Sequence, residues 1–393
     1  MKLFFIFLLT FLSAINAEPI HIRLSLGNEP NQYLFTWEDF DTDYQISSVL
    51  IKGHNYQGFS YLFDDSGEMS PPIRVHRVFV NNLKPNQQYE YQVGNSFSGF
   101  SKKYTFKTPS DNYPLRVSIY GDLGLDNHRI LKALSQTESD LVIHAGDFAY
   151  NLEYQKGNYA NKFFDLLSKD TTLTSENIFQ TCAGNHESHN NFSYYKSRIA
   201  TEFMHPMYYS FNLGKTHFVS INSEYYFYGN EEEQVKHRIW LEKDLANVNR
   251  SQTPWIIVFG HRQMYASGRQ SRVKESEILR NGLEDLFGKY EIDMYICGHQ
   301  HNYERMYPIF NKTYEIVNQP NIYRSPRFPI HVVNGAAGGP ELLEKFDYGI
   351  MPYSLVRKAE YSFGLITIYN ATHLLWEQID EERNIIDSFK IIK

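Results

Sequence analysis

Apolar and polar residues alternate with a two-residue period over the first quarter of the chain, which is the pattern of half-buried β-strands. Strands are predicted at residues 21–26, 33–37, 47–52, 75–80, 89–93 and 103–107. Turn-forming segments, such as residues 27–31, separate these strands. The pattern therefore predicts an all-β domain over residues 18–108.

After a linker at residues 108–114 the pattern changes, and apolar positions recur with a helical period between short apolar runs. The first helix is predicted to run from a cap at Asp126 or Asn127 to about residue 135. Further helices are predicted at residues 163–167, 232–248 and 275–290. The apolar face of the helix at 232–248 is expected to consist of Val235, Ile239, Trp240 and Leu245.

The apolar runs between these helices predict strands at residues 115–120, 141–145, 178–183, 207–212, 217–222, 255–259 and 292–297. Three later runs, at residues 330–334, 361–369 and 374–379, are expected to be strands that close a second sheet. Alternating strands and helices predict an α/β domain over residues 114–393.

Composition agrees with an ordinary globular protein. The chain has 393 residues, 42% of them hydrophobic, which is enough for two or three domains with large cores. The 30 Tyr and 28 Phe agree with a high content of sheet. The formal net charge of -7 gives no reason to expect nucleic acid or an anionic membrane as a partner.

Residues 1–17 have the features of a secretory signal peptide, with Lys2 before an apolar core at residues 3–12 and small residues Ala14 and Ala17 for cleavage. A transmembrane anchor is the alternative, but the apolar run is short for a bilayer. The protein is therefore expected to be secreted, or to reach lysosomes or endosomes through the secretory pathway. Four glycosylation sequons agree with that route, at Asn191, Asn249, Asn311 and Asn370.

The chain contains two cysteines, Cys182 and Cys297, and each lies in an apolar run. The preferred interpretation is two buried, reduced thiols that pack as small apolar groups. A disulfide between them stays open as the alternative.

Five predicted strands of the α/β domain end in glycine followed by a side chain that can bind a metal ion. The motifs are Gly121-Asp122-Leu123-Gly124, Gly146-Asp147-Phe148-Ala149-Tyr150, Gly184-Asn185-His186-Glu187, Gly260-His261 and Gly298-His299-Gln300-His301. In the last motif the two imidazoles are two residues apart, so an extended backbone points them to the same side. In open α/β sheets ligands bind beyond the carboxyl ends of the strands, so the five loops are expected to converge.

The motif set GDxG, GDxxY, GNHE, GH and GHxH, in this order, resembles the purple acid phosphatases of the metallophosphoesterase superfamily. Tyr150 matches the tyrosine that separates this family from the wider superfamily. Residues 83–93, 298–305 and 334–339 are similar to the long form, which carries a fibronectin type III domain. The resemblance implies an α+β multidomain fold, in which a fibronectin III-like β-sandwich precedes an α/β sandwich of two mixed sheets flanked by helices.

Carried over residue by residue, the resemblance implies a centre of two metal ions. Its ligands would be Asp122, Asp147, Tyr150, Asn185, His261, His299 and His301. Asp147 would bridge an Fe(III) ion, held also by Asp122, Tyr150 and His301, and a divalent Zn, Fe or Mn ion, held also by Asn185, His261 and His299. Two carboxylates and a phenolate suit the ferric ion, and an amide with imidazoles suits the divalent ion.

The implied activity is that of an acid phosphatase, a phosphoric monoester hydrolase that uses a metal-bound hydroxide as its nucleophile. His186 is expected to contact phosphate or protonate the leaving oxygen, and orientation of a ligand is the alternative role. The expected partner is a phosphate ester, with no nucleic acid and no stable membrane insertion, and the sequence assigns no oligomeric state. A phosphodiesterase or nucleotide pyrophosphatase is the near alternative, and a non-catalytic secreted binding protein is the distant one.

The chain departs from the family at one place. Many members have a further phosphate-binding histidine shortly after the residue that matches His261, but residues 262–298 contain no histidine. Arg262, Tyr265 and Arg269 are the candidates to contact phosphate instead, and arginine does not give up a proton at working pH. The glycine-rich stretch at 335–339 lacks the context of a P-loop, so it is expected to form a tight turn near the site.

Overall fold

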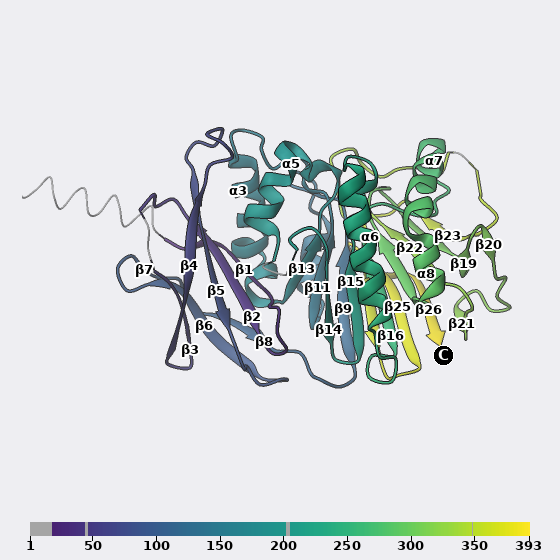
Figure 1. The fold of residues 1–393 in the computed structure, drawn as a ribbon, viewed down its shortest axis with the longest axis horizontal. Helices are drawn as coiled ribbons and strands as arrows, with labels where there is room; N and C mark the ends of the chain where they lie inside the picture. The colour runs from purple at the N-terminus through teal and green to yellow at the C-terminus, as the bar shows by residue number, and fades with distance from the viewer. Residues whose placement is uncertain (1–17, 44–45, 202–204, 348) are drawn as a thin grey trace, which may run out of the picture.

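The computed structural model describes residues 18–43, 46–201, 205–347 and 349–393. A β-rich domain lies at one end of the molecule, and the larger α/β domain extends from it towards the C-terminus at the other end (Figure 1). The predicted signal peptide, residues 1–17, lies outside the described residues.

The N-terminal domain is an antiparallel β-structure in two layers. Its strands are β1 (Ile20–Leu26), β2 (Tyr33–Asp39), β3 (Ser47–Ile51), β4 (His54–Phe63), β5 (Ile73–Val80), β6 (Gln88–Asn95), β7 (Gly99–Phe100) and β8 (Tyr104–Lys107). Strand β4 joins the layers, because its first half pairs with β3 and its second half pairs with β5. The sequence pattern missed β4, since most of its side chains are exposed or half-buried and no apolar alternation marks it.

Strand β1 attaches this domain to the α/β domain. Leu24 forms a parallel bridge with Ile178, and the Thr174 hydroxyl donates a 2.9 Å hydrogen bond to the carbonyl of Ile22. Nearby, buried Glu38 forms ion pairs with Arg23 at 3.0 Å and Arg198 at 2.6 Å. Although burial opposes the shift, the two arginines hold the pKa of Glu38 well below its usual range. The two domains therefore share buried backbone and charged contacts.

The α/β domain contains two seven-stranded mixed sheets. The first sheet has the order β13 (Phe179–Cys182), β11 (Leu141–Ala145), β9 (Leu115–Tyr120), β24 (Ser362–Ile368), β25 (His373–Asp380), β26 (Ile385–Ile392) and β21 (Ile322–Arg324). The second has the order β14 (Tyr209–Leu213), β15 (Thr216–Ser220), β16 (Trp255–Phe259), β17 (Met294–Cys297), β22 (Ile330–Asn334), β18 (Tyr303–Met306) and β23 (Ser354–Lys358). Short pairs are formed by β10 (Leu123–Gly124) with β12 (Phe148–Ala149) and by β19 (Ile309–Phe310) with β20 (Thr313–Tyr314).

Helices cover the outer face of each sheet, so the layers run helix, sheet, sheet, helix. The first sheet packs with α2 (Ile130–Ser135), α3 (Asn158–Asp165), η1 (Leu166–Asp170), α4 (Leu173–Glu176), α5 (His189–Tyr194) and η3 (Tyr195–Ile199), and the short η2 (Asn185–Glu187) follows β13. The second packs with η4 (Ser223–Tyr226), α6 (Glu231–Ala246), α7 (Gln270–Leu279), η5 (Arg280–Glu284) and α8 (Asp285–Lys289). Apolar side chains from the inner faces of both sheets share one core. The predicted fold class is therefore confirmed.

One prediction about the sheets is wrong in part. Residues 330–334 form β22 of the second sheet, as expected, but residues 361–369 and 374–379 correspond to β24 and β25 of the first sheet. Strand β24 pairs antiparallel with β9, more than 240 positions earlier in the chain. Local pattern identifies a strand but not its distant neighbour, because sheet order is decided by contacts across the fold.

Helix boundaries and faces also differ from prediction. Helix α2 begins at Ile130, after the expected caps, and α7 begins at Gln270, before the expected start. In α6, Val235 and Ile239 are 48% and 62% exposed. The buried positions of α6 are instead His237, Leu241 and Leu245, which recur every four residues. The predicted apolar face was wrong at Val235 and Ile239 but right at Leu245, because a buried histidine takes the place of an apolar residue in this stripe.

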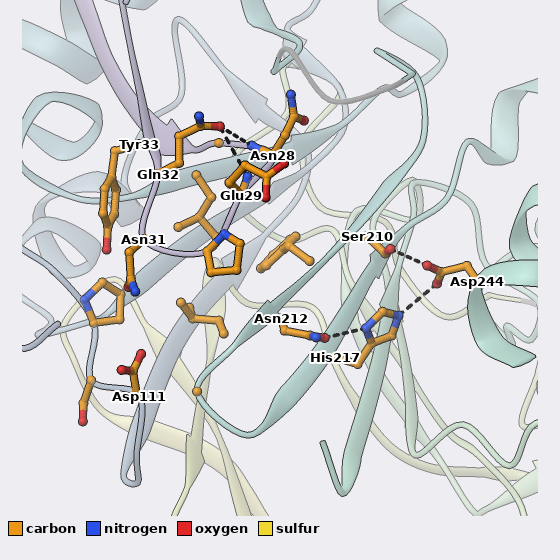
Figure 2. Close-up of a pocket in the computed structure, with 18 residues that line it drawn as sticks. Asn28, Glu29, Asn31, Gln32, Tyr33, Asp111, Ser210, Asn212, His217 and Asp244 are labelled. Atoms are coloured by element: carbon orange, nitrogen blue, oxygen red, sulfur yellow. Dashed lines mark hydrogen bonds and ion pairs between the residues drawn. The ribbon is translucent and has the colours of Figure 1, made fainter. Parts of the chain in front are cut away.

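A cavity of about 510 Å³ lies between the N-terminal domain, the linker and the β14–β15 hairpin (Figure 2). On one of its sides, His217 lies 2.9 Å from Asp244 and 2.7 Å from Asn212, and the Ser210 hydroxyl donates to Asp244. None of the glycine-motif residues lines this cavity. It is therefore separate from the loops expected to bind metal.

Candidate metal centre

The five glycine motifs lie at the carboxyl ends of strands in the two facing sheets. Strands β9, β11 and β13 are parallel neighbours in the first sheet, and β16 and β17 are parallel neighbours in the second. Parallel strands end at the same edge of a sheet, so the motif loops meet at one edge of the sandwich. The expected convergence of these loops is therefore what the fold produces.

One group of candidate ligands consists of Asp122, Tyr150 and His301. The Tyr150 hydroxyl lies 2.7 Å from His301 Nε2 and 3.5 Å from Asp122 Oδ1. His301 Nε2 lies 3.4 Å from the same Asp122 oxygen. All three side chains are buried, and their contacting atoms face one small volume.

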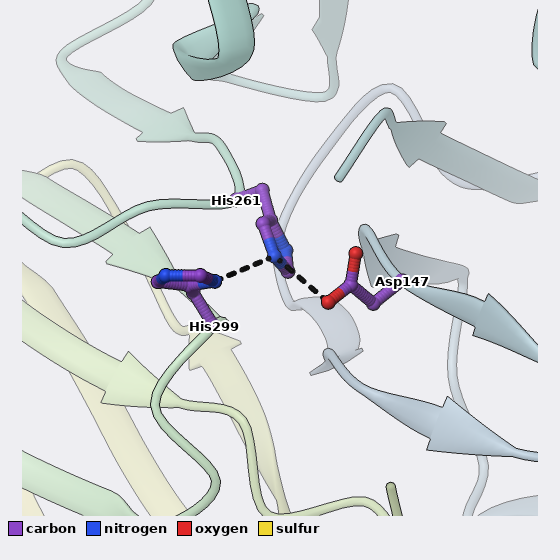
Figure 3. Close-up of side chains that lie close together, drawn as sticks. All are labelled: Asp147, His261 and His299. Atoms are coloured by element: carbon purple, nitrogen blue, oxygen red, sulfur yellow. Dashed lines mark hydrogen bonds and ion pairs between the residues drawn. The ribbon is translucent and has the colours of Figure 1, made fainter. Parts of the chain in front are cut away.

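A second group consists of Asn185, His261 and His299. His261 Nε2 lies 3.1 Å from Asn185 Oδ1 and 3.2 Å from His299 Nδ1. The same nitrogen lies 3.1 Å from Asp147 Oδ2, and Figure 3 shows His261 between Asp147 and His299. Ligand atoms of these last three residues all lie within 4.8 Å of one another. The structure therefore brings the seven predicted ligands into two adjoining groups.

Backbone carbonyls orient two of the imidazoles. His261 Nδ1 lies 2.9 Å from the carbonyl of Ala145, and His301 Nδ1 lies 3.2 Å from the carbonyl of Leu342. A carbonyl accepts only, so Nδ1 of each ring donates and carries the proton. The lone pair on Nε2 of each ring is then directed into its ligand group, as a metal ligand requires.

Several candidate ligands occupy the left-handed region of backbone space. The φ angles of Asp122, Asp147, Tyr150 and His299 are 65°, 58°, 60° and 67°. Such angles are costly for residues with a Cβ and concentrate at functional sites. The glycines beside these residues leave room for them: a Cβ on Gly298 would lie 2.3 Å from Asp122 Oδ2, and one on Gly339 would lie 2.4 Å from the Tyr150 hydroxyl. The stretch at 335–339 thus lies beside the site, as predicted.

Charge is concentrated among these ligands. Burial opposes ionisation of Asp147, but adjacent His261 lowers the pKa of its carboxyl below the ordinary value. Burial likewise opposes protonation of His261, but Asp147 raises its pKa to about 10. Burial, with the charges of Asp122 and Asp147, raises the pKa of the Tyr150 phenol well above its ordinary value. These buried acidic groups fit a site whose charge is balanced by cations.

Glu187 is a structural residue of this centre that the sequence interpretation missed. Its buried carboxylate accepts hydrogen bonds from the backbone N–H groups of Asp147 at 2.9 Å, Phe148 at 2.8 Å and Gly184 at 2.8 Å. Burial, and then the charge of Asp147, raises its pKa to about 8. Glu187 joins the loops that carry Asp147 and Asn185. The sequence did contain one indication of this role: Glu187 lies three residues after a glycine at the start of a helix, which is a capping position.

His186 lies at the edge of the centre. Its backbone N–H donates to Asp147 Oδ1 at 2.9 Å, and its ring Nδ1 lies 2.7 Å from Asn151 Oδ1. The ring is half-buried, with its centroid 4.5 Å from that of Tyr150. An amide oxygen accepts only, so Nδ1 donates and Nε2 is left with its lone pair.

The three residues suggested to replace the missing histidine differ in position. Tyr265 is buried, and its hydroxyl donates to Glu284, so its suggested contact with phosphate is not supported. Arg269 is half-exposed and pairs with Glu344 at 3.6 Å. Arg262 lies against His299, with Nη1 2.9 Å from the imidazole Nε2. Arg272, which the sequence did not single out, reaches the same nitrogen at 2.5 Å.

The two cysteines do not take part in this centre. Cys182 and Cys297 are buried free thiols, so the preferred interpretation of the cysteines is confirmed.

A second group of potential metal ligands, Asp65, Glu68 and His189, lies at the domain junction. Asp65 is already bonded to Asn190 at 3.0 Å and to Ser193 at 2.6 Å, which identifies the cluster as a contact between domains.

Family models match most of the chain. The model described as purple acid phosphatase, N-terminal domain, matches residues 19–108, and calcineurin-like phosphoesterase matches residues 115–303. Iron/zinc purple acid phosphatase-like protein C matches residues 328–388. The fold and the site thus define a metallophosphoesterase.

Individual relatives place the chain more closely. It is 34% identical over 412 residues to acid phosphatase type 7 of Homo sapiens, covering 97% of this chain and 92% of the relative. It is 30% identical to purple acid phosphatase 13 of Arabidopsis thaliana, covering 77% of this chain and 67% of the relative. The chain belongs to the purple acid phosphatase family and is an acid phosphatase by class. The predicted family and enzyme class are therefore confirmed.

The fold is also similar to a solved structure of a purple acid phosphatase from seeds of yellow lupin (Lupinus luteus). The match has a TM-score of 0.81 at 23% sequence identity and covers 96% of this chain and 74% of the lupin chain. At this identity the likeness supports the shared fold.

Proposed function

We propose that the protein hydrolyses phosphate monoesters at an Fe(III)–M(II) centre built from the two ligand groups. Asp122, Tyr150 and His301 would hold the ferric ion, and Asn185, His261 and His299 would hold divalent Zn, Fe or Mn. Asp147 would contribute to both. The observation that carries the proposal is the arrangement of these two groups. Within each group the ligand atoms lie close enough to bind one ion, and the oxygen-rich group lies next to the nitrogen-rich group.

The chemistry of the donors supports two ions rather than one. Family membership implies a dinuclear centre, and seven ligand-type side chains, six of them buried, exceed the four to six protein ligands that one such ion takes. When bound, a pair of ions supplies an activated nucleophile and electrostatic stabilisation of the phosphoryl oxygens. The protein's own part is to fix the ligands, through the carbonyls of Ala145 and Leu342 and the carboxylate of Glu187.

His186 is proposed to contact the substrate phosphate or to protonate the leaving oxygen. One support is the position of its half-buried ring beside Tyr150. The other is the contact between Nδ1 and Asn151, which leaves Nε2 free to face the substrate. Nε2 carries no proton when the ring is neutral and carries one that it can donate when the ring is charged. The alternative, that His186 orients Asn185 and Asp147, rests on its backbone bond to Asp147.

The test of this function is metal analysis combined with a substrate panel. Purified protein should contain about two metal ions per chain, one of them iron, and hydrolyse p-nitrophenyl phosphate faster than bis(p-nitrophenyl) phosphate. Faster hydrolysis of the diester would favour the phosphodiesterase alternative. A folded protein without metal and without either activity would favour the non-catalytic alternative.

The domain boundaries and the secretory route also belong to the proposal. The division at residues 18–108 and 114–393 is supported by the change from antiparallel to mixed sheets between β8 and β9. No helix in the described part of the chain is long and apolar enough to cross a membrane. Asn191, Asn249, Asn311 and Asn370 are all exposed, which glycosylation requires. Mass spectrometry of protein from a secreting cell, before and after deglycosylation, tests cleavage after residue 17 and each glycan.

A further inference from the structure

The outer nitrogen of His299 lies among charged side chains. His299 Nδ1 faces His261 and therefore the divalent-ion group, at 3.2 Å from His261 Nε2. On the other side of the ring, Nε2 lies 2.9 Å from Arg262 Nη1, 2.5 Å from Arg272 Nη1 and 3.0 Å from Glu275 Oε2. Two guanidinium groups thus converge on a candidate ligand from positions ten residues apart in sequence.

Hydrogen-bond donors exceed acceptors at this point. If Nδ1 of a neutral His299 binds metal, Nε2 carries the proton and becomes a donor. The two arginine Nη1 groups, which are donors only, then face another donor. Glu275 Oε2 is left as the shared acceptor, 3.2 Å from Arg272 Nη1 and 3.7 Å from Arg262 Nη1. One carboxylate oxygen with about two lone pairs would have to serve three N–H groups.

The remaining parts of both guanidinium groups are held firmly. Arg262 Nε bonds to both oxygens of Glu224, at 3.0 Å and 2.8 Å, and its guanidinium carbon lies 4.0 Å from the centre of the Phe227 ring. Arg272 Nη2 bonds to Glu344 at 2.6 Å. The two arginine side chains are only 5% and 14% exposed. Each arginine is therefore anchored at one end, with Nη1 directed at the outer nitrogen of His299.

One donor of Arg272 supports a missing anion directly. Its Nε is buried and has no hydrogen-bond partner among the described residues. Leaving a buried charged donor unpaired is costly, and such a group can be completed by a ligand, an ion or a water molecule. Fixed guanidinium groups with unused N–H groups are well suited to phosphate, whose oxygens accept charge-assisted hydrogen bonds.

We propose that Arg262 and Arg272 form an oxyanion subsite that binds the phosphoryl oxygens of the substrate and of inorganic phosphate beside the divalent-ion group. This inference rests on the proposed dinuclear function and deepens it. The subsite takes over phosphate binding in a chain that has no histidine at residues 262–298. Arginine stays charged at any working pH, so the subsite binds oxyanions without supplying a proton.

The test is the dissociation constant of inorganic phosphate, measured by titration calorimetry on metal-loaded protein, with bound metal determined on the same samples. Arg272→Gln removes one guanidinium and should weaken phosphate binding roughly 10- to 100-fold, the usual value of a charge-assisted hydrogen bond. The metal content should stay at the wild-type level. Arg262→Gln should behave in the same way, and Arg272→Lys should recover part of the affinity because it keeps the charge.

Arg269→Gln is the matched control. Arg269 shares Glu344 with Arg272 but is 50% exposed and makes no described contact with His299, so its loss should change phosphate affinity less than about twofold. Wild-type affinity for phosphate in Arg272→Gln and Arg262→Gln would overturn the subsite. Loss of metal from both variants would also overturn it, because the arginines would then position His299 rather than bind anions. Wild-type protein that lacks two metal ions, or lacks phosphatase activity, would instead overturn the proposed function.

Discussion

Tyr150 is a candidate ligand whose ionisation its surroundings strongly oppose. Burial raises the pKa of the phenol, and the charges of Asp122 and Asp147 raise it further. A cation of high charge beside the oxygen offsets all three effects, since metal coordination lowers the pKa of a ligand. The proposed ferric ion would offset these effects more than a divalent ion would, because its charge is higher.

The first prediction follows from that role. Purified protein should show a visible absorption band from charge transfer between the Tyr150 phenolate and Fe(III). Tyr150→Phe should abolish this band, because it removes the oxygen, while iron content falls by less than in variants of the bridging carboxylate. Absorption spectra and iron analysis of both proteins measure this. A band that survives the substitution would show that Tyr150 does not bind iron.

The second prediction concerns His186. General acid catalysis is typically worth roughly 10²- to 10⁴-fold, and it matters most when the leaving group is a poor one. His186→Ala should therefore slow hydrolysis of alkyl phosphates by about that factor and affect activated aryl phosphates much less. The kcat/KM values for the two ester types measure the effect. His189→Ala is the control, because His189 contacts Asp65 at 3.1 Å, outside the centre. Equal loss on both ester types would mean that His186 binds phosphate and donates no proton.

At the scale of elements, two loops are locked together by one side chain. Glu187 bonds back to Gly184 at its own helix start, as Glu233 bonds back to Asn230 at the start of α6. Only Glu187 also accepts from Asp147 and Phe148 on a separate loop. The same capping geometry therefore has an additional role at the centre, where it ties the loop that carries Asp147 to the loop that carries Asn185.

The third prediction uses this pair of glutamates. Glu187→Gln replaces one carboxylate oxygen by a donor, so at least one backbone N–H group of the ligand loops is left unpaired. Loss of such an orienting partner typically lowers metal affinity 10- to 100-fold, and we expect that range for the divalent ion. Glu233→Gln should leave metal affinity unchanged. Competition with a chelator measures both, and equal affinities in the two variants would contradict the role given to Glu187.

The sequence predicted the parts of the site that are local in the chain. Each candidate ligand follows an apolar strand and a glycine within four residues, so Asp122 and His261 are recognisable from a few letters. Arg272 was missed because nothing in its neighbourhood marks it, and its contact with His299 crosses 27 positions. Glu187 was missed as a structural residue for the same reason, since its partners lie 39 and 40 positions earlier.

At the scale of the whole molecule, the sequence established the order of domains and most strands but not how the sheets are completed. The C-terminal strands β24 and β25 belong to the first sheet and not to the second. Strand β24 lies at the centre of the first sheet, between β9 and β25. Strand β4 was missed because it joins two layers and exposes large apolar side chains such as Phe59 and Leu62. These features depend on contacts between distant segments, which the local period of apolar residues does not encode.

The whole fold also buries histidines in their neutral form. Burial lowers the pKa of His237 and of His331 to about 3. In the unfolded chain a histidine has a pKa of about 6.5, so between about pH 6.5 and pH 3 the unfolded state binds more protons. The free energy of unfolding therefore falls as the pH is lowered through this range. Well above pH 6.5 both histidines are neutral in the folded and the unfolded state, so they no longer make the free energy of unfolding depend on pH.

The fourth prediction tests this dependence. Each buried neutral histidine contributes a slope of at most about 1.4 kcal/mol per pH unit. His331→Gln removes one such group, so the loss of stability between pH 6 and pH 4.5 should be smaller than in wild type by about 2 kcal/mol, which is that slope over 1.5 pH units. Urea unfolding at several pH values measures it. His128→Gln, at an exposed position, is the control. An unchanged slope in His331→Gln would contradict the assignment.

The central claim is that one carboxylate, Asp147, serves both ligand groups, and metal stoichiometry tests it most directly. Asp147→Ala should lose both ions together, so that total metal per chain, measured by plasma mass spectrometry after dialysis, falls from about two towards zero. Asp65→Ala, which removes a carboxylate from the cluster at the domain junction, should keep both ions. Retention of one full equivalent of metal in folded Asp147→Ala would contradict the bridging role.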